Sequence, residues 1–167
     1  MSSTGASLRL PTLGRRGEGW VAAQLVLVAA VLTSPLAGHG WPGWAGAAAS
    51  VAGGGLMAFG LLLLATGIAE LLRKSALTAL PAPRGDGELA RQGLYGRVRH
   101  PMYGGGILFA LGWAVFFGTF VGLALSAVLA VFFEFKSRQE ETWLLARYPG
   151  YAAYRRRVRH RFVPFVH

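Results

Sequence analysis

The chain has 167 residues and no cysteine; 53% of its residues are hydrophobic and 14% carry a formal charge. A soluble domain has about 25% charged residues, so this composition predicts an integral membrane protein, and its length predicts a single domain. The lack of cysteine excludes disulfides, a thiolate nucleophile and cysteine-based zinc or iron–sulfur sites.

The formal net charge of +10 would suggest a nucleic-acid partner in a soluble protein, but the charges are unevenly placed. No Lys, Arg, Asp or Glu lies between Glu18 and Glu70, and none lies between Arg99 and Glu134. If the chain crosses the bilayer twice between one charged block and the next, all the charged blocks lie on the same side. An excess of Arg and Lys marks that side as cytoplasmic. We therefore expect an inner-membrane protein with both termini in the cytoplasm and no nucleic-acid partner.

The first half of the chain is predicted to hold a flexible arm and two transmembrane helices. Residues 1–19 carry three arginines among small and polar residues, which is typical of a disordered cytoplasmic arm. Residues 20–72 are long enough for two spans of about 30 Å each. A cleaved signal peptide is the alternative for the first span. We favour a retained helix because no suitable Ala-x-Ala site follows it.

Several residues in these two helices carry expectations of their own. Trp20 stands where an aromatic residue of the membrane interface belongs. Gly53, Gly60 and Gly67 recur every seven residues, which predicts the close approach of a neighbouring helix. Glu70 is expected to form an interfacial ion pair with the basic residues that follow it.

The second half predicts a loop, a helical hairpin and a charged segment. Residues 73–100 form the predicted cytoplasmic loop. Residues 101–133 would span about 50 Å as one helix, which is too long for one upright crossing, so we expect two short antiparallel helices with a break at Gly118-Thr119. Residues 134–167 begin as an amphipathic helix that is too charged to cross. The fold class is therefore all-α: a polytopic helical membrane protein with about four transmembrane helices.

The end of the chain is rich in arginine and aromatic residues. Pro149-Gly150 is expected to end the amphipathic helix, and the tail that follows is predicted to lie along the membrane surface. The string Arg-Val-Arg-His begins at position 97 and again at position 157. Nothing around the two copies matches, so we interpret the repeat as chance.

A polar corner precedes the hairpin. Pro101 suits the first turn of a helix and favours an extended backbone at His100. Three consecutive glycines, starting at Gly104, would weaken a helix by about 1 kcal/mol each relative to alanine, so a helix or a ligand is expected to approach them closely. Because the hairpin returns the chain to its starting side, Glu140 and Glu141 are expected near His100. Such a group suits a zwitterionic, partly cationic ligand.

The order of these motifs resembles a known group of enzymes. The segments that carry the resemblance are Gly93-Leu94-Tyr95, Val98-Arg99-His100-Pro101-Met102-Tyr103-Gly104-Gly105, Glu140-Glu141 ahead of Leu144-Leu145, and Tyr151-x-x-Tyr154-Arg155-Arg156-Arg157-Val158. This set, with a helical hairpin inside it, resembles the isoprenylcysteine carboxyl methyltransferase and phospholipid methyltransferase superfamily. The resemblance covers about the C-terminal half of the chain.

The resemblance implies a membrane methyltransferase that uses S-adenosylmethionine and is left with S-adenosylhomocysteine. It also implies a lipophilic or lipid acceptor, a carboxylate, thiol or amine, that arrives from the bilayer, and a C-terminal segment that covers the cofactor. No metal is expected. The implied cofactor-binding residues are Tyr95, Arg99, His100, Pro101, Tyr103, Gly105, Glu140, Glu141 and Tyr151.

The catalytic residues are predicted to be Glu141, Lys136 and Arg138. Eukaryotic relatives that methylate carboxylates carry arginines before the glutamate pair, and only Lys136 or Arg138 could take that part here. An amine acceptor would need a base, for which Glu70, Glu134 or Glu141 are candidates. Two alternatives stay open: a non-enzymatic basic membrane protein that binds anionic lipid or a partner, and a sterol-reductase-like enzyme that uses NADPH.

Overall fold

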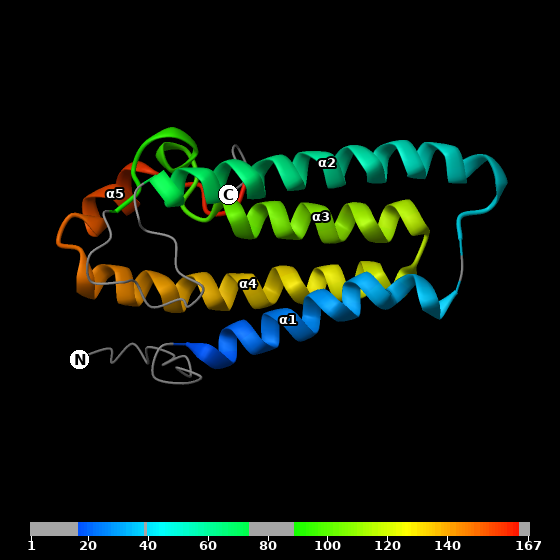
Figure 1. The fold of residues 1–167 in the computed structure, drawn as a ribbon, viewed down its shortest axis with the longest axis horizontal. Helices are drawn as coiled ribbons and strands as arrows, with labels where there is room; N and C mark the ends of the chain where they lie inside the picture. The colour runs from blue at the N-terminus through cyan, green and yellow to red at the C-terminus, as the bar shows by residue number, and fades with distance from the viewer. Residues whose placement is uncertain (1–16, 39, 74–88, 164–167) are drawn as a thin grey trace, which may run out of the picture.

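The computed structural model describes residues 17–38, 40–73 and 89–163 of the chain. These residues form helices that lie side by side in an elongated bundle (Figure 1). The elements in chain order are α1 (Glu18–Thr33), η1 (Ser34–Ala37), α2 (Gly43–Arg73), η2 (Gly93–Gly96), α3 (Pro101–Phe117), α4 (Phe120–Arg147) and α5 (Tyr151–Arg157). The part of the chain that is described has one isolated backbone bridge and no strand.

Three helical segments are long and apolar enough to cross a membrane: α1 with η1, α2 and α4. Helix α3 is also apolar but has only 17 residues. The predicted all-α membrane protein is therefore confirmed, with three long spans and one shorter apolar helix.

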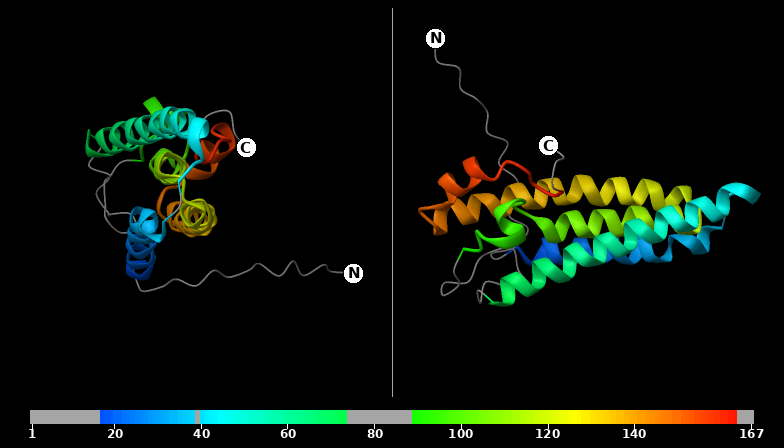
Figure 2. Two further views of the ribbon diagram at one scale, coloured as in Figure 1. Left: turned by 90° about the vertical axis from the view of Figure 1, so that its right-hand side faces the viewer. Right: turned by 90° about the horizontal axis from the view of Figure 1, so that it is seen from above.

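Helix α3 lies between α2 and α4, and α1 packs on α4 and α3 (Figures 1 and 2). The contact between α2 and α3 depends on glycines that face each other. A Cβ added at Gly53 would lie 2.7 Å from the carbonyl oxygen of Gly112, and one at Gly60 would lie 2.6 Å from that of Gly105. The predicted close approach along this glycine stripe is confirmed.

The hairpin turns at the predicted place. Gly118 ends α3 with a φ of 67°, which glycine adopts without strain, and Thr119 caps α4 by accepting a hydrogen bond from the backbone of Gly122 at 3.2 Å. The second arm is longer than expected. Helix α4 continues past residue 134 to Arg147, because no proline or glycine interrupts it before Pro149.

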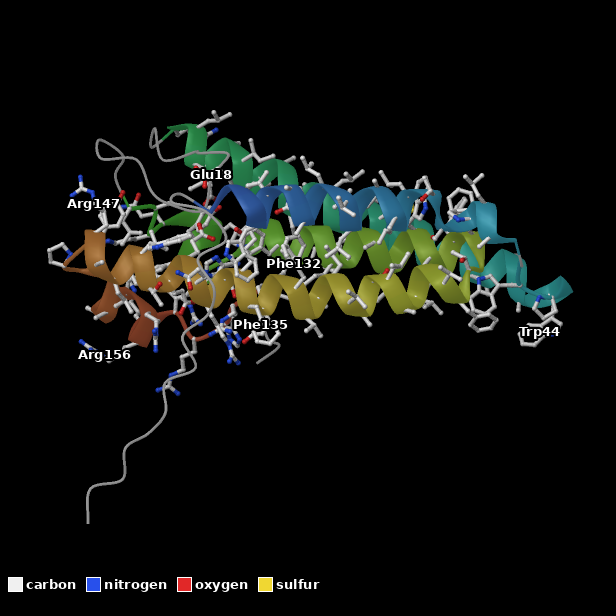
Figure 3. All side chains as sticks on the ribbon, turned by 90° about the horizontal axis from the view of Figure 1, so that it is seen from below. Glu18, Trp44, Phe132, Phe135, Arg147 and Arg156 are labelled. Atoms are coloured by element: carbon white, nitrogen blue, oxygen red, sulfur yellow. The ribbon has the colours of Figure 1, made fainter. Side chains whose placement is uncertain are left out.

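The charged side chains gather at one end of the bundle, where α1 and α3 begin and α2 and α4 end. We call this the charged end. Figure 3 shows Arg147 and Arg156 there, with Trp44 at the opposite end. The sequence distribution of charge therefore corresponds to one physical end of the molecule.

Two aromatic regions are more buried than the sequence indicated. Trp20 lies at the start of α1, where an interfacial aromatic residue was expected, but it is 5% exposed, with its ring centroid 5.4 Å from that of Phe132. The tail does not spread its aromatic residues along a membrane surface, because Tyr151, Tyr154 and Val158 form a buried cluster inside the protein. Burial against other side chains removes these residues from water as effectively as a membrane surface would.

Candidate functional site

His100 lies between the two adjacent glutamates of α4. It is the N-cap of α3, with a φ of −129° and a ψ of 61°; the backbone lies outside the helical region, as proline requires, but its ψ is smaller than in the extended conformation that was expected. Its Nε2 is 3.3 Å from Glu141 Oε1, and its Nδ1 is 3.6 Å from Glu140 Oε2. The hairpin thus brings the corner and the acidic pair together, as the sequence predicted.

Glu141 is the centre of a group of cations at the charged end. Its Oε1 accepts a hydrogen bond from Arg99 Nε at 2.8 Å and lies 3.7 Å from Arg161 Nε. Its Oε2 lies 3.6 Å from Arg155 Nη1. The side chain is 4% exposed, so the cations compensate a charge that would otherwise be costly to bury. Glu141 therefore holds the surrounding cations in place, and its carboxylate is not free to bind a ligand.

The corner is joined to the C-terminal segment, residues 158–162. The Arg99 guanidinium donates to the carbonyl oxygens of Val158 and Arg159 at 2.6 and 2.9 Å. The backbone N–H groups of Arg99 and His100 donate to the next two carbonyls at 3.0 and 2.7 Å. The two copies of Arg-Val-Arg-His, which we attributed to chance, are therefore neighbours in the fold.

Glu140 is the more accessible of the two glutamates. It accepts a hydrogen bond from the Tyr103 hydroxyl at 2.8 Å, and its side chain is 23% exposed. The Tyr103 ring stacks on His100 and on Phe133, with centroids 5.5 and 4.7 Å apart. Two ring contacts therefore hold Tyr103, and its hydroxyl orients Glu140.

Three buried tyrosines lie beside this group. The Tyr154 hydroxyl donates to the carbonyl oxygen of Tyr95 at 2.7 Å. The Tyr151 hydroxyl is buried and has no hydrogen-bond partner among the residues that the structure describes. Burial raises the pKa of all three phenols above their ordinary value, and the negative charge of nearby glutamates adds to this for Tyr95 and Tyr151. Each phenol therefore keeps its proton at neutral pH.

Glu70 caps the η2 turn. Its carboxylate accepts hydrogen bonds from the backbone N–H of Leu94, at 2.8 and 3.0 Å, and of Tyr95 at 3.4 Å. The ion pair expected with the bases that follow is not formed with Arg73 among the described residues, and Lys74 lies outside them. Glu70 fixes the turn that places Tyr95 beside the tyrosine cluster.

The three glycines of α3 each face a different neighbour. A Cβ at Gly104 would lie 1.9 Å from the carbonyl oxygen of Phe162, so the C-terminal segment crosses directly over this residue. A Cβ at Gly105 would meet the backbone of α2, and one at Gly106 would lie 3.3 Å from the Phe133 ring of α4. The predicted close approach is made by protein on all three sides, and Gly105 faces α2 rather than the glutamates.

Comparison with known protein families shows which family the chain belongs to. A family model described as phospholipid methyltransferase matches residues 48–150, which is more than half of the chain. The chain belongs to the phospholipid methyltransferase family. This family lies within the isoprenylcysteine carboxyl methyltransferase-like superfamily, so the resemblance is confirmed and the protein is a membrane methyltransferase. Comparisons with curated proteins and with solved structures found no match.

Lys136 and Arg138, the two basic residues predicted for catalysis, lie in different surroundings in this member of the phospholipid methyltransferase family. Lys136 is 4% exposed; its Nζ donates to Gln24 Oε1 of α1 and lies 5.1 Å from the centre of the Tyr103 ring. The side chain of Arg138 is 56% exposed and pairs with Glu134 at 2.7 Å. Only Lys136 extends into the bundle beside the site.

Most of the predicted site residues of this phospholipid methyltransferase family member meet at the charged end. The residues that converge there are Tyr95, Arg99, His100, Tyr103, Lys136, Glu140, Glu141 and Tyr151. Pro101 is buried, and its Cγ lies 3.6 Å from the position of a Cβ at Gly67, so it supports the contact with α2.

Four residues of the site were not among the predicted site residues: Gln24, Tyr154, Arg155 and Arg161. Gln24 had a signal, because it is the one side-chain amide in the charge-free stretch between Glu18 and Glu70. Tyr154 and Arg155 belong to the motif that carries the family resemblance, which assigned them no separate role. Arg161 had no signal, since the tail contains several arginines that look alike in sequence.

Proposed function

We propose that the protein is an S-adenosylmethionine-dependent methyltransferase whose acceptor is a lipophilic molecule delivered from the membrane. The observation that carries the proposal is the convergence of His100, Tyr103 and Glu140 at the charged end of a chain that belongs to a methyltransferase family. We further propose that this end faces the cytoplasm at the inner membrane, since an excess of arginine marks that side.

The residues present fit the proposed cofactor. Glu140 is a partly exposed carboxylate that suits the methionine ammonium group. The Tyr151 hydroxyl is a buried polar group without a protein partner among the described residues, which suits a hydrogen bond to a bound ligand. When bound, the cofactor supplies a methyl group on a sulfonium. His100 and Tyr103 fix Glu140, and the C-terminal segment covers the corner, so the chain provides alignment and exclusion of water.

The contacts of the carboxylates favour a carboxylate or thiolate acceptor. An amine acceptor needs a base to remove its proton, and the candidates were Glu70, Glu134 and Glu141. Glu70 binds backbone N–H groups, while Glu134 pairs with Arg138 and Arg161. Glu141 is held by the cations described above, so none of the three is a free base. Carboxylates and thiolates attack without one.

The first test is binding of S-adenosylhomocysteine to the detergent-solubilised protein. A ligand that binds only the folded state stabilises it by RT ln(1 + [L]/Kd), so the unfolding temperature rises with the logarithm of the ligand concentration once this exceeds the dissociation constant. We expect stabilisation of the wild type, and an affinity lower by about tenfold or more in His100→Ala and Glu140→Gln, which corresponds to about 1.4 kcal/mol. Arg156→Ala is the matched control, because Arg156 is exposed and, within the described part of the chain, pairs with neither glutamate of the site.

The same assay separates the alternatives. Stabilisation by NADPH instead of S-adenosylhomocysteine would indicate a reductase, and stabilisation by neither would indicate a non-enzymatic membrane protein. Transfer of a labelled methyl group to a panel of lipophilic acids, thiols and amines then identifies the acceptor. Preferential methylation of amines would contradict the acceptor class proposed above.

A further inference from the structure

Lys136 is a buried cation that points into the bundle. Side chains on a helix lean toward its N-terminus, and for α4 that direction leads away from the charged end. Lys136 Nζ accordingly reaches Gln24 on α1 rather than the water beyond Arg147. A lysine in a membrane-crossing helix normally extends its ammonium toward the membrane surface, so one that points into the bundle is unusual.

The described residues pair the ammonium of Lys136 incompletely. It has three N–H donors, and within this part of the chain it makes one hydrogen bond, to Gln24, and lies over the Tyr103 ring. Among the described residues no carboxylate oxygen lies within 4.0 Å of it. The nearby Glu140 already accepts from Tyr103 and faces His100. A cation that is 4% exposed therefore keeps donors that none of the described residues uses.

Gln24 connects α1 to Lys136 of α4. A glutamine in a membrane-crossing helix is costly unless its amide is hydrogen-bonded, and here its oxygen holds the Lys136 ammonium. Helix α1 lies outside residues 48–150, which match the family model, so Gln24 is a feature of this chain beyond that match. Its neutral oxygen orients the lysine without neutralising the positive charge.

We propose that Lys136 and Gln24 form an anion-binding subsite between α1 and α4, in which Lys136 binds the carboxylate or phosphate of the lipophilic acceptor and Gln24 is its positioning residue. The inference rests on the proposed function and names the acceptor class for that site. An anion there completes the pairing of the buried ammonium. It also places the acceptor beside Tyr103 and Glu140.

The test uses four ten-carbon probes that differ in their head group: decanoate, decyl phosphate, decanol and decylamine. Dissociation constants are measured by calorimetry with the full chain in one non-ionic detergent, so that partition into micelles is common to all variants. The wild type is expected to bind the two anions about tenfold more tightly than decanol or decylamine. The preferred anion distinguishes a carboxylate from a phosphate acceptor.

Variants identify the residues responsible. Lys136→Met is expected to abolish the preference for anions. Gln24→Glu keeps the cation but supplies a competing carboxylate, so it is also expected to abolish the preference while the protein stays folded. Gln24→Leu should weaken it, since the lysine loses its orienting partner. Thr66→Val is the control, because Thr66 is exposed and bonds only to carbonyls of its own helix.

Two results would overturn the subsite: no preference for anions in the wild type, or a preference that survives both Lys136→Met and Gln24→Glu. A merely structural Lys136 would change the unfolding temperature of these variants without changing head-group selectivity. Binding of S-adenosylhomocysteine is measured on the same samples. If it is absent while the anion preference holds, the methyltransferase proposal fails and the subsite stands; the reverse result rejects the subsite alone.

Discussion

The side chains of Arg99 and Glu141 form a hydrogen-bonded ion pair of 2.8 Å across 42 positions of sequence. Their exposed fractions are 8% and 4%, so the pair is held away from water. Since Arg99 also binds the carbonyls of the C-terminal segment, this pair connects α4, the corner before α3 and the segment that follows α5. It is the main electrostatic link of the charged end.

Glu141→Gln is expected to destabilise the protein more than Glu140→Gln does. Loss of the buried carboxylate leaves Arg99 and its neighbouring cations without compensation, which costs about 3 kcal/mol in other proteins. Glu140 is more exposed, so its replacement should affect ligand binding with little change in unfolding temperature. Thermal unfolding and S-adenosylhomocysteine binding of both variants check this. Equal unfolding temperatures would show that Glu141 does not organise the site.

Gly104→Ala is expected to displace the C-terminal segment. The added Cβ would lie 1.9 Å from the Phe162 carbonyl oxygen, a backbone atom that can move only with its segment. We predict weaker binding of S-adenosylhomocysteine and faster proteolysis after residue 157. Gly55→Ala is the matched control, because a Cβ there meets nothing within 4 Å, and alanine favours a helix by up to about 1 kcal/mol. If both variants behave alike, the close approach has no functional consequence.

Glu70→Ala is expected to loosen the turn that places Tyr95. The backbone N–H of Leu94 would lose its acceptor, and an unsatisfied N–H of this kind costs about 1–3 kcal/mol. We predict a lower unfolding temperature and faster hydrogen exchange at residues 93–96. Arg73→Ala distinguishes this cap from the ion pair that the sequence suggested. A similar loss of stability in Arg73→Ala would favour the ion pair.

The buried tyrosines predict a loss of stability at alkaline pH. The pKa values of Tyr95, Tyr151 and Tyr154 are raised in the folded state above the ordinary value of 10.0. Their contribution to stability is therefore fully present below pH 10, where the unfolded phenols are also protonated. It declines as the pH rises above 10, because the unfolded chain then releases protons that the folded chain retains.

Thermal unfolding between pH 8 and pH 11, followed together with phenolate absorbance, tests this expectation. Tyr154→Phe and Tyr151→Phe should each flatten the decline above pH 10. Ionisation of all five tyrosines of the chain near pH 10, without unfolding, would contradict the burial of these phenols.

Local chemistry decided the class of this protein and much of its chain path. Two long stretches without charge require membrane helices, because water-free surroundings penalise ionised side chains. Pro101 and the Gly118-Thr119 pair set the ends of α3 and the start of α4, since backbone preferences act within a few residues. The glycines that recur every seven residues in α2 predicted a close helix contact, which the structure shows to be with α3.

Tertiary structure alone decided which arginines of the tail and which residue of α1 join the site. Nothing in the tail distinguishes Arg155 and Arg161, which face Glu141, from Arg156, which does not. The contact of Gln24 with Lys136 joins the first helix to the fourth, and its formation depends on the packing of α1 on α4. Ion pairs and hydrogen bonds between distant residues are set by the free energy of the whole fold, which no short stretch of sequence contains.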